Sequence, residues 1–318
     1  MSEAIAIGIH GGCGTLERAA LSDAAWAEAR AHLAASLKAG WAVLVAGGSS
    51  IDAVEAAVVV MEDSPHFNAG HGAALNEDGF HELDASIMDG STMAAGGVCA
   101  VRRIRNPVKA ARAVMERTGC VLIAADAADA FARSAGLAMV DNRYFTTERR
   151  VAALKSLKER AVRGTIGLAS EAEKHGTVGA VARDRTGALA SATSTGGYNN
   201  KPTGRVGDSP IIGAGTYAVN GIAAVSCTGM GEAFIRHAVG HDIVARMRYA
   251  GADLETATGT IIHEVMPAEK VGAGLVAVDA AGRVLAPFNT LGMYRGWIMA
   301  DGQIVVGTHG ETVAMGCA

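Results

Sequence analysis

The sequence predicts an α+β fold in which antiparallel sheets are covered by helices. Helical stretches with recognisable caps lie in the first half of the chain, and the chain becomes rich in short apolar strands after residue 177. Turn residues separate some of these strands in the manner of hairpins. Hairpin-connected strands with helices grouped around them favour antiparallel sheets over a parallel nucleotide-binding sheet.

The first sixty residues are expected to form a strand followed by two neighbouring helices. Alternation over residues 4–9 predicts a strand that leads to His10 and a glycine-rich turn. Residues 22–46 form a predicted helix that the glycines at 47–48 end. Residues 49–52 have the pattern of a capping box for the second helix.

The middle of the chain is expected to hold two strands, a helix and a charged segment. The strands are predicted near residues 83–88 and 98–102. Asn and Pro occupy the cap and first-turn positions of a predicted helix over residues 106–117. Residues 145–174 are charged with little strand character, which indicates a helix followed by a solvated connector.

Two hairpins are predicted after residue 177. Strands over residues 178–182 and 189–195 flank the turn sequence at 184–187, and residues 276–285 repeat this pattern. We interpret them as two hairpins of one sheet system rather than as a repeat protein.

Composition restricts the class of protein. The 318 residues, half of them hydrophobic, can bury a large core. The net charge of −4 and the lack of a Lys/Arg-rich run argue against a nucleic-acid partner. The N-terminus lacks the pattern of a secretory signal, and the apolar runs are too short to span a bilayer. We therefore expect a cytoplasmic protein without a membrane partner.

Cysteines and histidines give no metal-binding pattern in the sequence. The five cysteines are scattered without CxxC spacing and are interpreted as small buried residues. His263-Glu264 lacks a second histidine four residues later, so it is not a zincin helix. His81-Glu82 and the pair His237 and His241 are interpreted as ordinary polar residues, and no transition metal is assigned.

The pair Gly176-Thr177 stands where a polar segment gives way to an apolar strand. If the bond between them is cut, Thr177 supplies both a hydroxyl nucleophile and a free α-amine, which titrates near ~8 and can act as its base. Gly176 permits the strained backbone in which the hydroxyl attacks the preceding carbonyl and forms an ester that water opens. Taken alone, a Gly-Thr pair is usually an ordinary strand start or helix cap.

Several motifs in order along the chain distinguish this pair from an ordinary one. They read Ile9-His10-Gly11-Gly12, Phe67-Asn68-Ala69-Gly70-His71-Gly72, Thr193-Ser194-Thr195-Gly196-Gly197, Ser226-Cys227-Thr228-Gly229 and Asn289-Thr290-Leu291-Gly292, with further motifs at residues 81–90 and 200–210. Over nearly the whole chain they resemble the plant-type L-asparaginases and bacterial isoaspartyl peptidases of the N-terminal-nucleophile (Ntn) hydrolase superfamily.

The resemblance implies a four-layer αββα sandwich that cuts itself. Residues 1–176 would form an α subunit, with the connector at about 146–176, and residues 177–318 a β subunit that begins with the nucleophile. Both would belong to one folded domain. Two such αβ pairs would associate into a dimer of heterodimers.

The resemblance also assigns the catalytic residues. Thr177 is the nucleophile, Thr195 contacts its hydroxyl, and Asn68 supports the nucleophile region. Thr228 and Gly229 match an oxyanion hole, where loss of one donor costs on the order of a hundredfold in rate. Without the resemblance, Thr195 would be read as an ordinary strand residue, and the Thr228-Gly229 turn as the start of a helix.

Arg205, Asp208 and Gly231 match the residues that bind the substrate. A guanidinium forks onto a carboxylate and an aspartate accepts from an ammonium, so Arg205 and Asp208 suit the α-carboxylate and α-ammonium of an aspartyl unit. Gly231 is assigned a main-chain contact to the ammonium. The alternative for Arg205 and Asp208 is an exposed surface pair of little consequence.

No cofactor is expected for catalysis, but the resemblance implies a structural sodium ion. Its ligands would be main-chain carbonyls, a donor type that hard cations prefer. They would come from Met61, Glu62, Ser64, Phe67, Ala69 and His71.

The expected activity is hydrolysis of β-aspartyl (isoaspartyl) dipeptides and of L-asparagine through a β-aspartyl ester. A glycosylasparaginase-type amidase and a non-catalytic binding relative of the fold are the alternatives. A nucleotide-binding protein is a third, and it lacks a GxGxxG or Walker lysine.

Overall fold

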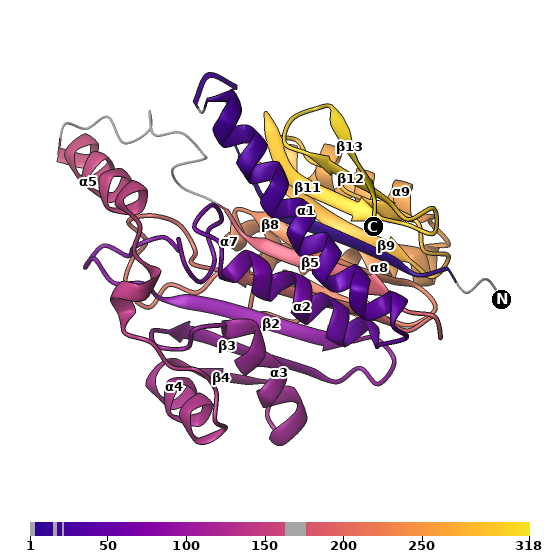
Figure 1. Ribbon diagram of the computed structural model, residues 1–318, viewed down its shortest axis with the longest axis horizontal. Coiled ribbons are helices and arrows are strands. Elements are labelled where there is room, and N and C mark those ends of the chain that lie inside the picture. The colour runs from indigo at the N-terminus through magenta and orange to yellow at the C-terminus, as the bar shows by residue number, and fades with distance from the viewer. Residues whose placement is uncertain (1–3, 15–17, 21, 163–175) are drawn as a thin grey trace.

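Two sheets pack face to face between two groups of helices, which gives four layers (Figure 1). The computed structural model describes residues 4–14, 18–20, 22–162 and 176–318. This arrangement confirms the predicted α+β class and the αββα sandwich. Two expected features, the connector beyond residue 162 and the residue before Gly176, lie outside the described residues.

The larger sheet has the strand order β13-β12-β11-β1-β5-β6-β2-β3-β4. Its strands are β1 (Ala6–Gly14), β2 (Leu83–Asp89), β3 (Ala95–Val101), β4 (Leu122–Ala124), β5 (Val178–Arg183), β6 (Leu189–Thr195), β11 (Gly292–Ile298), β12 (Gln303–Gly307) and β13 (Thr312–Cys317). Neighbours are antiparallel except β3 and β4. That parallel pair follows from the helix that connects the two strands, since a parallel connection needs a crossover.

The smaller sheet has the order β10-β9-β8-β7 and is antiparallel throughout. Its strands are β7 (Thr216–Val219), β8 (Ala223–Gly229), β9 (Ala273–Asp279) and β10 (Val284–Leu285). Both predicted hairpins form, as β5–β6 and β9–β10. They lie in different sheets, so the prediction of one sheet system was wrong. Turn residues define a hairpin locally, but only packing decides which sheet it joins.

Helices cover the outer face of each sheet. The larger sheet is covered by α1 (Asp23–Val45), α2 (Ser50–Glu62) and α3 (Pro107–Arg117), and the smaller by α7 (Gly231–His237), α8 (Val239–Ala250) and α9 (Leu254–Thr260). Also present are α4 (Ala125–Ser134), α5 (Glu148–Val162), a π-helical segment (Ile261–Val265) that continues into α10 (Met266–Ala268), and 3-10 turns at Arg18–Ala20 and Asn142–Phe145. Among the described helices, none is long and apolar enough to cross a membrane.

The predicted helix caps are mostly correct. Ser22 caps α1 by accepting from Ala25 N, and Ser49 caps α2 by accepting from Asp52 N, both at 3.2 Å. Asn106 precedes α3 as predicted, but its side chain donates to Asp63 Oδ1 at 3.2 Å instead of capping the helix. A nearby carboxylate competes with the helix for this amide.

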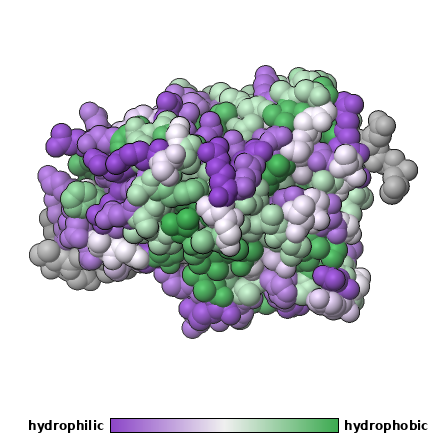
Figure 2. All heavy atoms as spheres, turned by 90° about the horizontal axis from the view of Figure 1, so that it is seen from below, coloured by the Kyte–Doolittle hydropathy of each residue, from purple (hydrophilic) through white to green (hydrophobic). Residues whose placement is uncertain are grey.

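The core has three parts. Apolar side chains fill the space between α1–α3 and the larger sheet, between α7–α9 and the smaller sheet, and between parts of the two sheets. Cys13, Cys99 and Cys227 are buried as predicted, whereas Cys120 and Cys317 are exposed. The surface seen from below in Figure 2 has hydrophobic residues between hydrophilic ones.

Part of the space between the sheets is polar rather than apolar. His10, Ser86, Thr193, Thr216 and Ser226 are fully buried there. Buried polar groups require hydrogen-bond partners, so these side chains must satisfy one another. One of them, His10, contacts the carbonyl oxygen of Thr177.

Candidate active site

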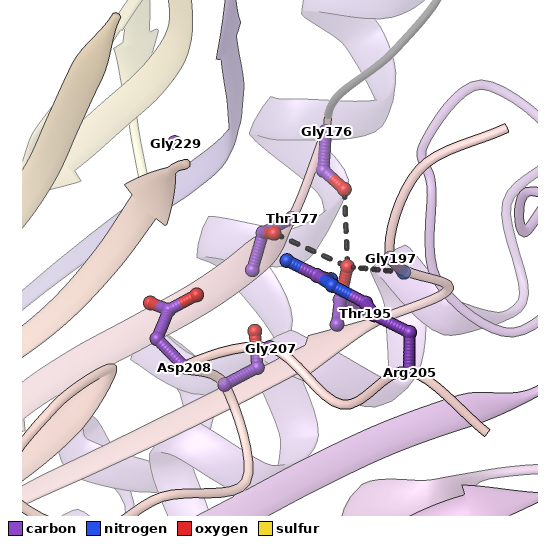
Figure 3. Close-up of a pocket in the computed structure, with 9 residues that line it drawn as sticks. Gly176, Thr177, Thr195, Gly197, Arg205, Gly207, Asp208 and Gly229 are labelled. Atoms are coloured by element: carbon purple, nitrogen blue, oxygen red, sulfur yellow. Dashed lines mark hydrogen bonds between the residues drawn. The ribbon is translucent and has the colours of Figure 1, made fainter. Parts of the chain in front are cut away.

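Thr177 immediately precedes β5, which lies between β1 and β6 in the larger sheet. Its side chain faces a small pocket (Figure 3). The pocket combines residues from the ends of β5, β6 and β8 with a loop after β6, and its lining consists of Gly176, Thr177, Thr195, Gly197, Arg205, Gly207, Asp208, Ser209 and Gly229. Most of the residues singled out from the sequence therefore meet in one place.

Thr195 links the Thr177 hydroxyl to the carbonyl before it. Thr177 Oγ1 donates to Thr195 Oγ1 at 3.1 Å, and Thr195 Oγ1 donates to Gly176 O at 3.2 Å (Figure 3). Gly197 N also donates to Thr195 Oγ1, at 3.0 Å, and fixes the direction in which Thr195 gives its proton. The three groups form a hydrogen-bonded path from the Thr177 hydroxyl to the carbonyl oxygen of Gly176.

Asn68 supplies a second donor to the same carbonyl. Its Nδ2 donates to Gly176 O and to Gly197 O, both at 2.6 Å, while Oδ1 accepts from Ala74 N at 2.6 Å. These contacts determine the orientation of the amide, since only nitrogen can donate to two carbonyls. Gly176 O thus has two side-chain donors preorganised around it, the arrangement that stabilises an oxyanion.

His10 contacts the carbonyl oxygen of Thr177. Its Nδ1 lies 2.9 Å from Thr177 O, and its Nε2 lies 2.9 Å from Ser226 Oγ. Burial lowers the pKa of His10 to about 3, so the ring is neutral. Because a carbonyl only accepts, Nδ1 carries the proton, and Nε2 accepts from the Ser226 hydroxyl.

A chain of hydroxyls continues from His10 across the space between the sheets. Ser226 Oγ lies 2.7 Å from Thr193 Oγ1, which accepts from Thr216 Oγ1 at 2.6 Å. Ser86 Oγ lies 2.8 Å from Thr216 Oγ1. Side chains from β1, β8, β6, β7 and β2 therefore hold the backbone at Thr177 through one connected network, in which each member fixes the orientation of the next.

Two glycines make this approach possible. A Cβ at Gly179 would overlap Ser226 Oγ and lie 2.5 Å from His10 Nε2. Gly12 has φ +103°, and a Cβ there would lie 2.8 Å from Gly176 Cα and 3.0 Å from Thr177 N. Side chains at either position would displace the groups around the 176–177 bond.

Thr228 and Gly229 lie at the end of β8, on the opposite sheet from Thr177. Thr228 Oγ1 is buried and has no hydrogen-bond partner among the described residues. A buried hydroxyl without a partner is costly, which is typical of a group reserved for a ligand. Gly229, at φ +145°, faces the pocket, and a Cβ there would lie 2.6 Å from Gly272 O.

Arg205 and Asp208 extend from their loop toward Thr177 (Figure 3). Neither forms the exposed surface pair considered as an alternative: Asp208 is 4 % exposed, and the Arg205 side chain is 12 % exposed. Arg205 Nε and Nη2 each donate to Glu232 at 2.9 Å, and its guanidinium stacks 4.7 Å from the centre of the Tyr198 ring. Glu232 and Tyr198 therefore fix the orientation of the guanidinium.

Asp208 is buried without a fixed partner for Oδ2 among the described residues. Burial raises its pKa to about 7, against the opposing effect of Arg205. Gly231 lies close by, because a Cβ on it would be 2.9 Å from Asp208 Oδ1. A cationic ligand beside Asp208 would be matched by its carboxylate.

Comparison with known proteins agrees with this geometry. Residues 3–308 match the model of a protein family described as asparaginase. The chain belongs to the asparaginase family. The isoaspartyl peptidase of Salmonella typhimurium is 46% identical over 98% of this chain and 100% of its own, and that of Escherichia coli is 45% identical over 97% and 98%. The isoaspartyl peptidase/L-asparaginase of Xenopus laevis is 41% identical over 95% of each chain.

The loop predicted to bind sodium follows α2 in this asparaginase-family chain. Glu62 O accepts from His71 N at 2.7 Å, and Met61 O accepts from Ser64 N at 3.2 Å. Phe67 O approaches the positive-φ residue Gly72, where a Cβ would lie 2.9 Å away. Two of the six predicted sodium ligands, the carbonyls of Met61 and Glu62, therefore already accept hydrogen bonds. Met61 and Glu62 are the last residues of α2, and Ser64, Phe67, Ala69 and His71 lie in the loop that follows.

Sequence reasoning missed several residues of the asparaginase-family site. His10, Ser226 and Thr193 were seen only as parts of motifs, and Glu232 only as the start of a helix. Glycines at 12 and 179 were a usable signal, since glycine in a strand often marks a close approach. The ring of His71 has a clear role, because Nδ1 lies 2.7 Å from Tyr144 O.

Proposed function

We propose that this chain is a self-processing N-terminal threonine hydrolase that cleaves β-aspartyl dipeptides and L-asparagine. The observation that carries the proposal is the path from Thr177 Oγ1 through Thr195 to Gly176 O, with Asn68 as second donor. The names of the relatives, which include both isoaspartyl peptidase and L-asparaginase, support the substrate class.

In the self-cleavage step, Thr177 Oγ1 attacks the carbonyl carbon of Gly176. The hydroxyl proton leaves by way of Thr195, while Asn68 Nδ2 and Thr195 Oγ1 stabilise the negative charge on Gly176 O. The bond from Gly176 C to Thr177 N then breaks, the nitrogen gains a proton, and an ester remains. Water hydrolyses the ester and leaves Thr177 with a free hydroxyl and a free amine.

In the substrate reaction, Thr177 Oγ1 attacks the β-carbonyl of the aspartyl unit. Its own amine takes the hydroxyl proton and delivers it to the leaving amine or ammonia. Thr228 Oγ1, which has no partner among the described residues, and Gly229 N–H donate to the oxyanion. Water then resolves the β-aspartyl ester and regenerates the hydroxyl.

Arg205 and Asp208 would select an aspartyl unit with free α-groups. Arg205 receives the α-carboxylate, and Asp208 with Gly231 receives the α-ammonium. The mostly polar lining of the pocket suits the charged α-groups of this unit. His10 contributes by holding the Thr177 carbonyl in both reactions.

We propose the remaining properties from the family resemblance. Residues 1–176 and 177–318 would be the subunits after cleavage, and two αβ pairs would associate in the cytoplasm. Carbonyls of the loop after α2 would hold a sodium ion, which would stabilise the loop that presents Asn68 and take no part in proton transfer.

Intact mass measurement with N-terminal sequencing tests the proposal. After incubation, a fragment that begins Thr177-Val178-Gly179 is expected, and it should be absent from the Thr177→Ala variant. The matured protein should hydrolyse β-aspartyl dipeptides and L-asparagine. A folded chain that stays full length, or a matured chain without activity on either substrate, would contradict the proposal. Preference for a glycosylated asparagine would favour the glycosylasparaginase alternative.

A further inference from the structure

Three side chains with metal-binding atoms gather away from the pocket. They are Glu28 and His32 on α1 and His66 in the loop after α2, and one ligand atom of each lies within 4.8 Å of those of the others. Among the described residues, no other group of three His, Cys, Asp or Glu side chains meets this criterion.

The backbone brings the three residues together for simple reasons. Glu28 and His32 are four residues apart on a helix, so their side chains lie on the same face. His66 approaches that face from the loop: its Nε2 lies 3.3 Å from Glu28 Oε1, and its ring centre lies 4.6 Å from that of His32. Sequence spacing alone does not reveal this group, because His66 comes from a separate segment.

The separations match those of a coordinated metal ion. With metal–ligand bonds of about 2.0–2.1 Å, two ligand atoms of a tetrahedral zinc site lie roughly 3.3 Å apart. Glu28 Oε1 and His66 Nε2 already have this separation. The third ligand atom, from the partly buried His32, lies within 4.8 Å of both.

The donor set selects the type of metal. Two imidazoles and one carboxylate suit Zn²⁺ and neighbouring transition metals, whereas Mg²⁺ and Ca²⁺ prefer sites built from oxygen. Glu28 is well exposed, so the site is open to solvent and a water molecule can complete the coordination. A metal ion would also hold together two histidine rings that repel each other when both are protonated.

Metal binding here would reinforce the loop that carries Asn68. His66 precedes Asn68 by two positions, and Asn68 Nδ2 donates to Gly176 O. The main chain at His66 is already fixed on its other side, because Arg149 Nη2 donates to His66 O at 3.0 Å. The carbonyl of His66 is not among the predicted sodium ligands, so the two sites are separate.

We propose that Glu28, His32 and His66 bind a divalent transition-metal ion, Zn²⁺ in particular, and that the ion connects α1 to the loop that presents Asn68. The proposal is independent of the proposed hydrolase activity. It predicts one zinc ion per chain and a melting temperature that rises with zinc concentration, because a ligand of the folded state alone stabilises that state.

Zinc titration of the untagged, chelator-treated protein tests this proposal by calorimetry and thermal melting. The variants are His32→Gln and His66→Leu, and the matched control is His263→Leu, which alters an exposed histidine on the opposite helical layer. Loss of His32 or His66 should weaken zinc binding on the order of tenfold or more and remove most of the thermal shift, since even outer ligand partners contribute that much. The control should bind as the wild type does.

Cobalt titration gives a second readout, because a tetrahedral site of this kind absorbs visible light and the His32→Gln variant should lose that absorption. Circular dichroism shows whether each variant is folded, and Glu28→Gln, at an exposed position, replaces any variant that is not. The proposal is overturned if the wild type binds no zinc, or if zinc binds all the folded variants equally, which would place the ion elsewhere on the surface.

Discussion

Thr195 accepts a hydrogen bond from the Thr177 hydroxyl at 3.1 Å and is the only residue through which that hydroxyl is connected, among the described contacts, to Gly176 O. Thr177 immediately precedes β5, and Thr195 is the last residue of the neighbouring strand β6, where Val178 pairs with Ser194. The register of the β5–β6 pair therefore positions the hydrogen bond between Thr177 and Thr195.

Thr195→Val should slow self-cleavage on the order of a hundredfold or more. The valine has the same shape but neither accepts the proton of Thr177 nor donates to Gly176 O, so one of two oxyanion donors is lost. Thr195→Ser keeps the hydroxyl and should cleave at a rate close to that of the wild type. The time course of the full-length chain by intact mass measures both rates. Equal rates for the valine and serine variants would exclude the relay.

His10 should act on the position of the nucleophile and not on the binding of substrate. An asparagine at position 10 places a hydrogen-bond donor where His10 Nδ1 lies, whereas a phenylalanine there provides none. In protein that has matured, His10→Phe should lower kcat by about a hundredfold with little change in KM, since a misplaced nucleophile costs that much. His10→Asn should recover part of the loss.

The pH profile separates this role of His10 from acid–base catalysis. With a pKa of about 3, the ring does not titrate between pH 5 and 9. The ratio of wild-type to His10→Asn activity should therefore be constant over that range. A ratio that changes with pH near neutrality would contradict the positioning role.

The raised pKa of Asp208 predicts that substrate binding depends on pH. Its pKa is about 7 in the folded protein. The pH must therefore exceed about 7 before the side chain is a carboxylate that can accept hydrogen bonds from an ammonium. The kcat/KM for L-asparagine should therefore fall as the pH drops below about 7. Asp208→Asn should bind poorly at every pH and lack this step, while a step near ~8 from the Thr177 amine persists. An unchanged profile in the variant would exclude Asp208.

The same raised pKa predicts a stability effect. The folded protein favours the protonated form, so the contribution of Asp208 to stability is fully present below the unfolded pKa of 3.8 and is lost as the pH rises through about 7. The loss is about 1.4 kcal/mol per pH unit. Unfolding of the folded Asp208→Asn variant in urea at several pH values should show stability that depends less steeply on pH.

Arg205 should contribute mainly to substrate affinity. Arg205→Ala removes the charge that receives the α-carboxylate and should raise KM about tenfold to a hundredfold, the range for a charged hydrogen bond. Glu232→Gln leaves the guanidinium in place but weakens its fixed orientation and should raise KM less. Steady-state kinetics on L-asparagine measures both variants. A normal KM in Arg205→Ala would show that the carboxylate binds elsewhere.

Local features of the fold could be predicted from the sequence, and long-range contacts could not. The cap at Ser22 and the turn at residues 184–187 depend on neighbours in the chain, and both formed as predicted. His10 and Thr177 are 167 positions apart, so their contact depends on the pairing of β1 with β5. The pairing of Arg205 with Glu232 likewise requires the loop and α7 to meet.

The resemblance supplied what local patterns could not. The grouping of Thr177, Thr195 and Asp208 in one pocket was expected only from the order of the motifs. The hydrogen-bond partners could not be predicted from the motifs, because a motif gives residue types but not their tautomers, rotamers or burial. The neutral state of His10 follows from its complete burial, which is a property of the packed sheets.

Lys201 gives a last prediction about the support of the site. It is fully buried behind Gly197, and its Nζ donates to Glu82 O at 2.8 Å. Burial lowers the pKa of Lys201, and the charge of buried Asp84 opposes that shift. Lys201→Met leaves Asp84 buried without this countercharge and should lower the free energy of unfolding by about 3–5 kcal/mol. The double variant Lys201→Met with Asp84→Asn removes both charges and should recover much of the loss. Urea unfolding at pH 7 measures all three proteins. A double variant less stable than the single one would show that the two charges do not stabilise each other.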